Sequence, residues 1–200
     1  KLDIILEKTE KQVFDIAQNR GSKEFTDIKE IVLRSIDSIE AASKNKGSVT
    51  GIATGFYDLD YKTAGLQPSD LILIAARPSM GKTAFALNIA EYVVLRSNIT
   101  TAVFSLEMSQ DQLVKRMLAM NSRVDSQNIR TGNLSADEWA SLMESARVIG
   151  NSNLVIDDTS AITVGELRSK CRKLKLEKNL GLVIIDYLQI LAPYDIRATD

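Results

Sequence analysis

Gly81, Lys82 and Thr83 stand together where an apolar segment gives way to a helical one. In such a strand-to-helix turn, backbone N–H groups and the helix N-terminus together attract an anion. A lysine there supplies a positive charge to the β- and γ-phosphates of a nucleotide, and a threonine hydroxyl can bind Mg²⁺. These residues therefore predict the binding of a nucleoside triphosphate. The predicted phosphate cradle comprises Ala76, Arg77, Pro78, Ser79, Met80, Gly81, Lys82 and Thr83.

The match to the P-loop pattern G-x-x-x-x-G-K-[ST] has one departure. The first glycine of the pattern is replaced by Ala76, so the backbone at that position must tolerate a Cβ atom. The alternative is a chance Gly-Lys-Thr at an ordinary turn. The apolar segment before it and the helical pattern after it favour the P-loop.

Acidic residues follow two further apolar segments, where they could take part in hydrolysis. Asp186 ends the segment 182–185, and open α/β sheets bind ligands at the carboxyl ends of their strands. It is therefore the predicted second protein ligand of Mg²⁺. Glu107 follows the segment 101–105, and because the chain has no histidine, a carboxylate is the expected group to orient and deprotonate water. The alternative for Glu107 is a first-turn acid that stabilises a helix N-terminus.

Asp157 and Asp158 occupy a position similar to that of Asp186, at the end of the segment 154–157. An acid at a strand end is most often a turn or capping residue. We interpret both residues in that way and place neither in the site.

The elements that must position these residues follow an alternating pattern. Unbroken apolar or β-branched segments at 71–75, 101–105, 154–157 and 182–185 are typical of strands buried on both faces. Helical patterns lie at 83–96, 109–120, 135–150 and 163–178. The order β-α-β-α-α-β-α-β predicts an α/β fold with a mostly parallel sheet and right-handed crossovers.

The first 46 residues have a different pattern and are expected to form a helical region, followed from residue 47 by the nucleotide-binding domain. A helix over 2–17 is predicted by an apolar stripe and is ended by Gly21. A second helix is predicted to start at Thr26 and Asp27 and to end before Lys44, and the Gly/Ser/Thr-rich stretch 47–55 is predicted to be a linker. The stripe of the first helix consists of Leu2, Ile5, Leu6, Val13, Ile16 and Ala17.

Composition excludes several classes of protein. The 25 Lys and Arg residues against 26 Asp and Glu give a net charge of −1, so any contact with DNA must be local. The absence of histidine removes the usual zinc ligands and the Ser-His-Asp triad, and the single cysteine, Cys171, excludes an internal disulfide and favours a reduced cytosol. Apolar runs are too short to cross a bilayer. The chain begins at Lys1 without a methionine, which suggests a piece of something longer.

Five sequence blocks occur in order along the chain: TGIATGFYDLD at 50–60, GLQPSD at 65–70, AARPSMGKT at 75–83, FSLEMS at 104–109 and IDYLQ at 185–189. Taken together, they closely resemble the bacterial replicative DNA helicases of the DnaB family, and the resemblance covers essentially the whole chain. An alanine in place of the first P-loop glycine is itself usual in that family.

The resemblance implies a RecA-like ATPase domain, here truncated at its C-terminal end, that works as a ring-shaped hexamer around single-stranded DNA with ATP bound between neighbouring subunits. By motif position, Glu107 is similar to the catalytic glutamate, Gln189 to the glutamine that senses the γ-phosphate, and Arg116 to an arginine that contacts the nucleotide. Gln189 could instead be a surface amide, and Arg116 a solvated helix residue.

The resemblance also implies partners and a location. Helix 2–17 resembles the linker helix that docks on a neighbouring subunit, although it could instead pack on its own domain. The segments that grip DNA and the arginine finger are expected beyond Asp200, and primase and a helicase loader are expected partners of the intact, cytoplasmic protein.

Two conspicuous features are given ordinary structural interpretations. The basic residues of the segment 163–178 are expected to form a solvated helix surface, with Val164, Leu167, Cys171 and Leu174 as the buried face. Trp139 is expected in the core.

Two other functions remain open at this point. One is a RecA-like recombinase that hydrolyses ATP without unwinding DNA. The other is a binding module that engages a partner through helix 2–17.

Overall fold

The computed structural model describes residues 27–44 and 49–188. The chain divides into two compact units, 1–48 and 49–200. In the first unit the structure describes one helix, α2 (Ile28–Lys44), whose start is capped by Asp27: the Lys29 N–H donates to Asp27 Oδ1 at 2.8 Å. This confirms the second predicted helix, which ends at Lys44 rather than before it. The predicted helix 2–17 lies outside the described residues.

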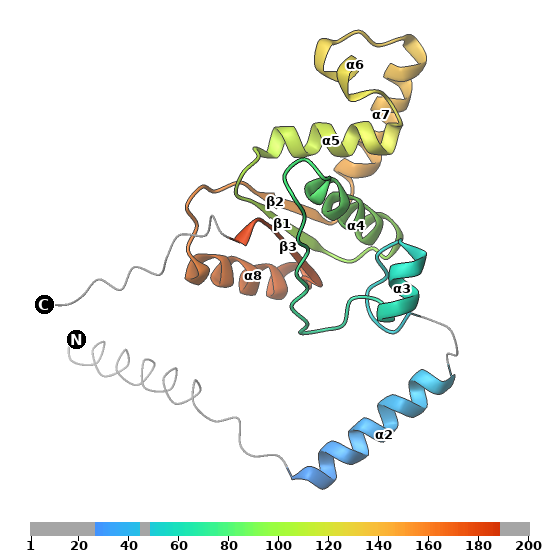
Figure 1. The fold of residues 1–200 in the computed structure, drawn as a ribbon, viewed down its shortest axis with the longest axis vertical. Helices are drawn as coiled ribbons and strands as arrows, with labels where there is room; N and C mark the ends of the chain where they lie inside the picture. The colour runs from blue at the N-terminus through green and yellow to red at the C-terminus, as the bar shows by residue number, and fades with distance from the viewer. Residues whose placement is uncertain (1–26, 45–48, 189–200) are drawn as a thin grey trace, which may run out of the picture. The chain divides into compact units, whose positions relative to one another are not determined.

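The second unit contains a parallel three-stranded sheet in the order β2-β1-β3 (Figure 1). Its strands are β1 (Thr101–Ser105), β2 (Leu154–Asp157) and β3 (Leu182–Asp186). Three of the four predicted strands and the α/β class are therefore confirmed. All three strands end at the same edge of the sheet, because parallel strands share their direction.

Four helices match the predicted positions within two residues. Two of them begin at capping boxes, in which Ser135 pairs with Glu138 and Thr163 pairs with Glu166. Two short helices, α3 (Tyr57–Thr63) and α6 (Ser126–Thr131), were not predicted, because one or two turns carry too little periodicity. The four predicted helices are α4 (Lys82–Arg96), α5 (Gln110–Ser122), α7 (Ala136–Gly150) and α8 (Val164–Lys178).

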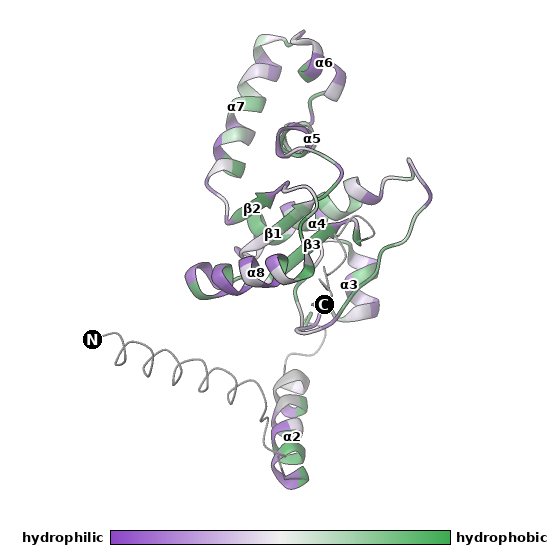
Figure 2. Cartoon of the chain, turned by 90° about the vertical axis from the view of Figure 1, so that its left-hand side faces the viewer, coloured by the Kyte–Doolittle hydropathy of each residue, from purple (hydrophilic) through white to green (hydrophobic). Residues whose placement is uncertain are grey.

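Helices cover both faces of the sheet, and alternate residues of β1 serve the two faces. Val103 packs with α4 and α5, whereas Ala102 and Phe104 pack with Ile162, Leu180 and the inner side of α8. Figure 2 views the sheet from the side, with α5 above it and α8 below it. The crossover from β1 to β2 and the crossover from β2 to β3 thus lie on opposite faces, as right-handed connections in opposite directions require.

The predicted strand 71–75 is wrong in this structure. The segment is not part of the sheet, and the side chains of residues 71–74 are between 42% and 80% exposed. Each strand of the sheet forms hydrogen bonds with a neighbouring strand. Among the described residues, no strand lies beside this apolar segment to pair with it. An apolar run predicts burial on both faces, but it does not itself supply the partner.

The predicted linker 47–55 is wrong over its second half. Ile52 forms an antiparallel bridge with Leu66, and Thr54 is fully buried. Its N–H and hydroxyl donate to Asp60 Oδ1 at 2.8 and 2.7 Å. This stretch of small polar residues is therefore a hydrogen-bonded loop, because the buried carboxylate of Asp60 on α3 accepts bonds from it.

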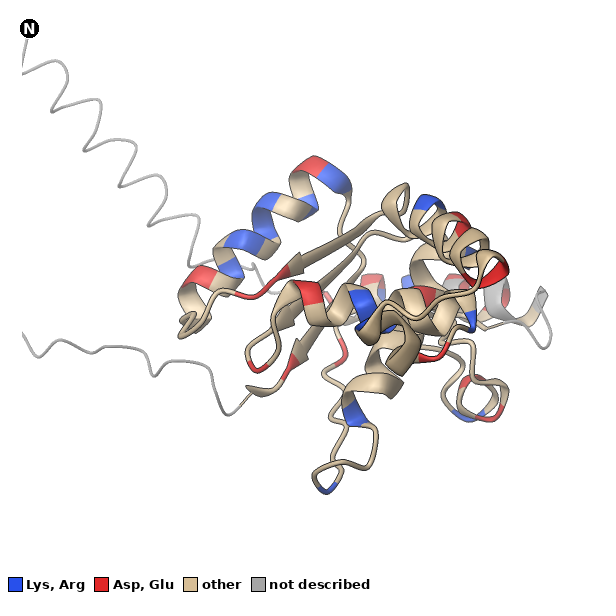
Figure 3. Ribbon diagram, turned by 90° about the horizontal axis from the view of Figure 1, so that it is seen from above, with Lys and Arg blue, Asp and Glu red and all other residues tan. Residues whose placement is uncertain are grey.

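Trp139 was predicted in the core but is 55% exposed. The buried residues of α7 are Leu142 and Ser145. Trp139 lies one turn before Leu142, at the side of this buried face. On α8, Leu167, Cys171 and Leu174 pack against the sheet as predicted, while Val164 is exposed. Most of the Lys and Arg residues of α8 lie on its exposed side, and Figure 3 shows them along the helix. In the part of the chain that the structure describes, no helix is long and apolar enough to span a bilayer.

Candidate functional site

The predicted phosphate cradle forms the turn that leads into α4. The turn closes through a hydrogen bond from the Met80 N–H to the Arg77 carbonyl at 3.2 Å, and Gly81 has a positive φ of 87°. A Cβ added to Gly81 would meet no atom within 4 Å, so the space above this glycine is open. Gly81 also holds the N-cap position of α4, where it has no side chain to cap the first turn. The N–H groups of that turn therefore remain available to an anion.

Lys82, Thr83 and Asp186 come together although 103 positions separate Thr83 from Asp186 in the sequence. The Lys82 ammonium lies 2.8 Å from Asp186 Oδ1, and the Thr83 hydroxyl donates to Asp186 Oδ2 at 2.6 Å. Asp186, at the end of β3, is only 7% exposed. A buried carboxylate needs such partners, because its desolvation is otherwise costly. The structure thus joins the lysine and threonine of the cradle to the predicted acidic residue.

Tyr187 is part of this cluster and was not predicted as a site residue. The Lys82 ammonium lies 4.2 Å from the centre of its ring, which is cation–π contact distance. The sequence signal for Tyr187 was its place directly after Asp186. An aromatic side chain has many structural roles, so its residue type gave no reason to assign it to the site.

Glu107 lies at the same edge of the sheet. Ser105 at the end of β1 is paired with Asp186, and the Leu106 N–H donates to the Asp186 carbonyl at 2.8 Å. Glu107 directly follows this bonded residue, and its side chain is exposed. This position suits a group that acts on a bound ligand.

One further predicted residue, Arg116, is not brought into this cluster. Arg116 is an exposed residue of α5, and among the residues described it has no hydrogen bond or ion pair with the cluster. Gln189 lies outside the described residues.

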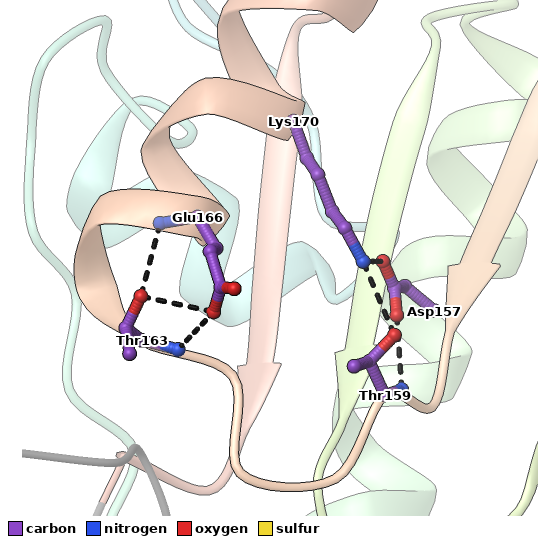
Figure 4. A network of polar contacts seen from close by, with 5 residues as sticks. All are labelled: Asp157, Thr159, Thr163, Glu166 and Lys170. Carbon is purple, nitrogen blue, oxygen red and sulfur yellow. Dashed lines mark hydrogen bonds and ion pairs between the residues drawn. The ribbon is translucent and has the colours of Figure 1, made fainter.

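Asp157 and Asp158 are a turn residue and a capping residue, as predicted: the Thr159 N–H donates to Asp157 Oδ1 at 2.9 Å, and Asp158 caps α5. Asp157 is also ion-paired, which was not predicted. The Lys170 ammonium lies 2.5 Å from Asp157 Oδ2 and 3.1 Å from Thr159 Oγ1 (Figure 4). Burial alone would raise the pKa of Asp157, but hydrogen bonds from Lys170 and Thr159 outweigh it and lower the pKa. Asp158 accepts the Gln110 N–H at the start of α5 at 3.0 Å.

The donor set at the end of β3 fits Mg²⁺ bound together with a nucleotide. A hydroxyl and a carboxylate are hard oxygen donors, and Mg²⁺ usually takes one or two protein ligands and completes its shell with phosphates and water. The described residues contain no group of three or more His, Cys, Asp or Glu that could hold a metal alone. A hydroxyl and a single carboxylate leave the other coordination positions of a metal to phosphates and water.

Comparisons with known proteins agree with this geometry. The family model of the DnaB-like helicase C terminal domain matches residues 51–199. The replicative DNA helicase DnaC of Bacillus subtilis is 46% identical over 191 residues, which are 96% of this chain and 42% of that protein. The replicative DNA helicase DnaB of Geobacillus stearothermophilus is 45% identical over the same shares. The chain thus spans about two fifths of the length of these relatives.

Solved structures give the same result. One, described as an ATPase domain, has a TM-score of 0.80 at 34% identity and is matched over 88% of this chain and 62% of its own. A DnaB-like replicative helicase, described with its interactions with primase, has a TM-score of 0.75 at 31% identity, over 97% of this chain and 46% of its own. A family model that matches most of the chain, relatives that match nearly all of it and a shared fold agree: the chain belongs to the DnaB-like helicase C-terminal domain family.

Proposed function

We propose that this chain supplies the nucleotide-binding part of a replicative DNA helicase, which couples Mg²⁺-dependent ATP hydrolysis to translocation on single-stranded DNA and unwinding of the duplex. The observation that carries this proposal is the cluster of Lys82, Thr83 and Asp186 at the end of β3, in a chain of this family. The names of the relatives favour a helicase over a recombinase or a binding module.

Each residue of the cluster has a proposed role when ATP binds. Lys82 exchanges Asp186 for the β- and γ-phosphates, while the backbone of residues 76–81 and the N-terminus of α4 surround the phosphate oxygens. Thr83 and Asp186 hold Mg²⁺, which neutralises charge on the phosphates.

The remaining residues act around the transferred phosphoryl group. Glu107 orients water for attack on the γ-phosphate and accepts its proton. We assign Gln189 to sensing the γ-phosphate and Arg116 to contact with the nucleotide, as the family resemblance implies.

Partners follow from the same proposal. Single-stranded DNA is bound by segments beyond Asp200, neighbouring subunits form a homohexameric ring, and primase and a helicase loader bind the intact protein in the cytoplasm. One solved relative is described with its interactions with primase, which supports the primase contact. Residues 1–46 form the helical linker region, and residues 47–200 form the ATPase domain.

The test is DNA-stimulated ATP hydrolysis and strand separation by the full-length protein that contains this chain. Lys82→Ala and Glu107→Gln are each expected to lower the hydrolysis rate at least about 10²-fold, because each removes a group that stabilises or activates the reacting atoms. The matched control is Lys62→Ala on α3, an exposed lysine remote in sequence from the cluster, which leaves the rate unchanged. ATP hydrolysis without strand separation would contradict the helicase function. A near wild-type rate for Glu107→Gln would remove Glu107 as the base.

A further inference from the structure

We infer that Ser105 and Asp158 are positioning residues for Glu107, holding from two sides the turn that carries it. This inference rests on the proposed role of Glu107 in hydrolysis. It concerns residues that, in the described part of the chain, make no side-chain bond to Lys82, Thr83 or Asp186, and that act through the conformation of residues 106–109.

Ser105 closes the turn on its N-terminal side. Its side chain is at the end of β1 and the residue is only 2% exposed. The hydroxyl donates to the Met108 carbonyl at 2.7 Å, and the same oxygen accepts the Met108 N–H at 3.2 Å. A hydroxyl can serve as donor and acceptor at once, so one side chain satisfies both backbone groups of Met108. Glu107 is enclosed in the loop that these two bonds close.

The same turn is tied to the metal-binding strand. The Leu106 N–H donates to the Asp186 carbonyl at 2.8 Å. The backbone of Glu107 therefore lies between one residue bonded to Asp186 and another bonded to Ser105. A glutamate anchored on both sides keeps its distance from the carboxylate of Asp186 better than one on a free loop.

Asp158 fixes the C-terminal side of the turn. Ser109 stands at the N-cap position of α5 but makes no side-chain capping bond. The Gln110 N–H is instead capped by Asp158 Oδ2 at 3.0 Å, from the segment that follows β2. The start of α5, three residues after Glu107, is thereby attached to a neighbouring strand end. A cap supplied from another strand fixes the helix start relative to the sheet, which a local cap would not do.

The residue type at position 105 supports this interpretation. All five residues of β1 are buried, and a hydroxyl in such a strand costs free energy unless it is hydrogen-bonded. Within the described part of the chain, the side-chain bonds of Ser105 are directed to the turn and to no other element. A purely structural role would stabilise the turn without affecting hydrolysis, so the two roles make different kinetic predictions.

The first experiment is a double-mutant cycle in the full-length protein, with DNA-stimulated hydrolysis as readout. Ser105→Ala is expected to lower kcat about tenfold, as loss of about one hydrogen bond of positioning would, with KM for ATP within about twofold. In the Glu107→Gln background the same substitution is expected to have no further effect, because residues that act as a unit are not additive. Two results would overturn the positioning role of Ser105 without affecting the role of Glu107. One is a tenfold loss of kcat from Ser105→Ala in both backgrounds, and the other is no loss of kcat from Ser105→Ala although Glu107→Gln is slow. A fast Glu107→Gln would overturn the role of Glu107 itself.

The second experiment covers the case in which Ser105→Ala does not fold. Asp158→Ala removes the acceptor for the Gln110 N–H, whereas Asp158→Asn keeps an amide oxygen in its place. We expect Asp158→Ala to lower kcat several-fold and Asp158→Asn to restore most of the rate, with nucleotide affinity equal in both. Equal rates for wild type and Asp158→Ala would contradict a positioning role for Asp158. A loss of rate in Asp158→Asn as large as in Asp158→Ala would assign the effect to charge and overturn positioning through the cap.

Discussion

A single carboxylate, that of Asp186, organises the site at the scale of residues. It accepts the Thr83 hydroxyl, pairs with the Lys82 ammonium and is almost fully buried. Nucleotide phosphates must therefore compete with Asp186 for Lys82, and their negative charge is repelled by the same carboxylate. In the proposed function, Mg²⁺ would relieve this conflict, since it binds carboxylate and phosphate together.

This competition gives a prediction about metal removal. In the wild-type protein, chelation of Mg²⁺ is expected to weaken ATP binding. In the Asp186→Asn variant, the loss of ATP affinity on chelation is expected to be smaller than in wild type by about tenfold or more. The affinity for ATP without metal is expected to be higher than in wild type, because the carboxylate that competes for Lys82 is gone. Isothermal titration of ATP with Mg²⁺ and with a chelator measures both. Asp157→Asn, an acid at the end of β2, is the control. An unchanged Mg²⁺ dependence in Asp186→Asn would contradict the assignment of this residue.

Some of these site residues could be predicted from the sequence and others could not. Lys82, Thr83 and Asp186 were predicted because their types and positions at strand ends follow a recurring chemistry. Tyr187 and Ser105 were missed because an aromatic ring and a small hydroxyl in or near a buried strand are compatible with many roles. Their roles depend on distances that only the folded chain defines.

At the scale of elements, α8 is attached to β2 by charge as well as by apolar packing. Lys170 bonds Asp157 and Thr159 (Figure 4). Leu167, Cys171 and Leu174 pack on the sheet. The pKa of Asp157 is lowered in the folded protein, where its burial is outweighed by hydrogen bonds from Lys170 and Thr159. A carboxylate with a lowered folded pKa stabilises the fold above its unfolded pKa, and loses that contribution as the pH falls through the folded value.

The resulting prediction is a stability difference that depends on pH. Asp157→Asn is expected to lower the free energy of unfolding at pH 7 by about 1 kcal/mol. This difference from wild type should shrink as the pH falls below about 4, the unfolded value for aspartate. Urea unfolding of the chain at a series of pH values measures it. Lys170→Gln should reproduce the loss at pH 7, whereas Lys173→Gln, whose contact with Glu177 is a long 3.9 Å, should not. A difference that stays constant from pH 7 to pH 3 would contradict this account.

Elements were predicted well where local pattern and tertiary contacts agree. The helices α7 and α8 have capping boxes and the strands β1, β2 and β3 have both apolar faces covered. The segments 47–55 and 71–75 were predicted wrongly for one reason: their structure depends on a partner that lies outside the segment. Asp60 converts a polar stretch into a bonded loop, and the lack of a neighbour among the described residues leaves an apolar stretch outside the sheet.

At the scale of the whole molecule, the apolar stretch at 71–74 sets the behaviour of the chain on its own. Four consecutive apolar side chains are exposed there, directly before the phosphate cradle. Exposed apolar runs with unpaired backbone groups favour association between copies. Yet an unbroken apolar run is also typical of a strand that is buried on both faces. The same residues are therefore expected to behave differently in this chain and in a longer protein that covers them.

This contrast gives a prediction with opposite signs in two proteins. The isolated chain is expected to associate with rising concentration, and Leu71→Lys combined with Leu73→Lys is expected to keep it monomeric, because two charges per copy oppose stacking of the run. In the full-length protein the same pair is expected to lower the unfolding temperature by several degrees, because it would bury two charges. Sedimentation velocity and thermal unfolding measure the two effects. Tyr57→Lys with Tyr61→Lys, at exposed positions on α3, is the matched control and should change neither. If the Leu71 and Leu73 substitutions left the thermal stability of the full-length protein unchanged, this run would be a surface loop there as well, and no buried strand would precede the phosphate cradle.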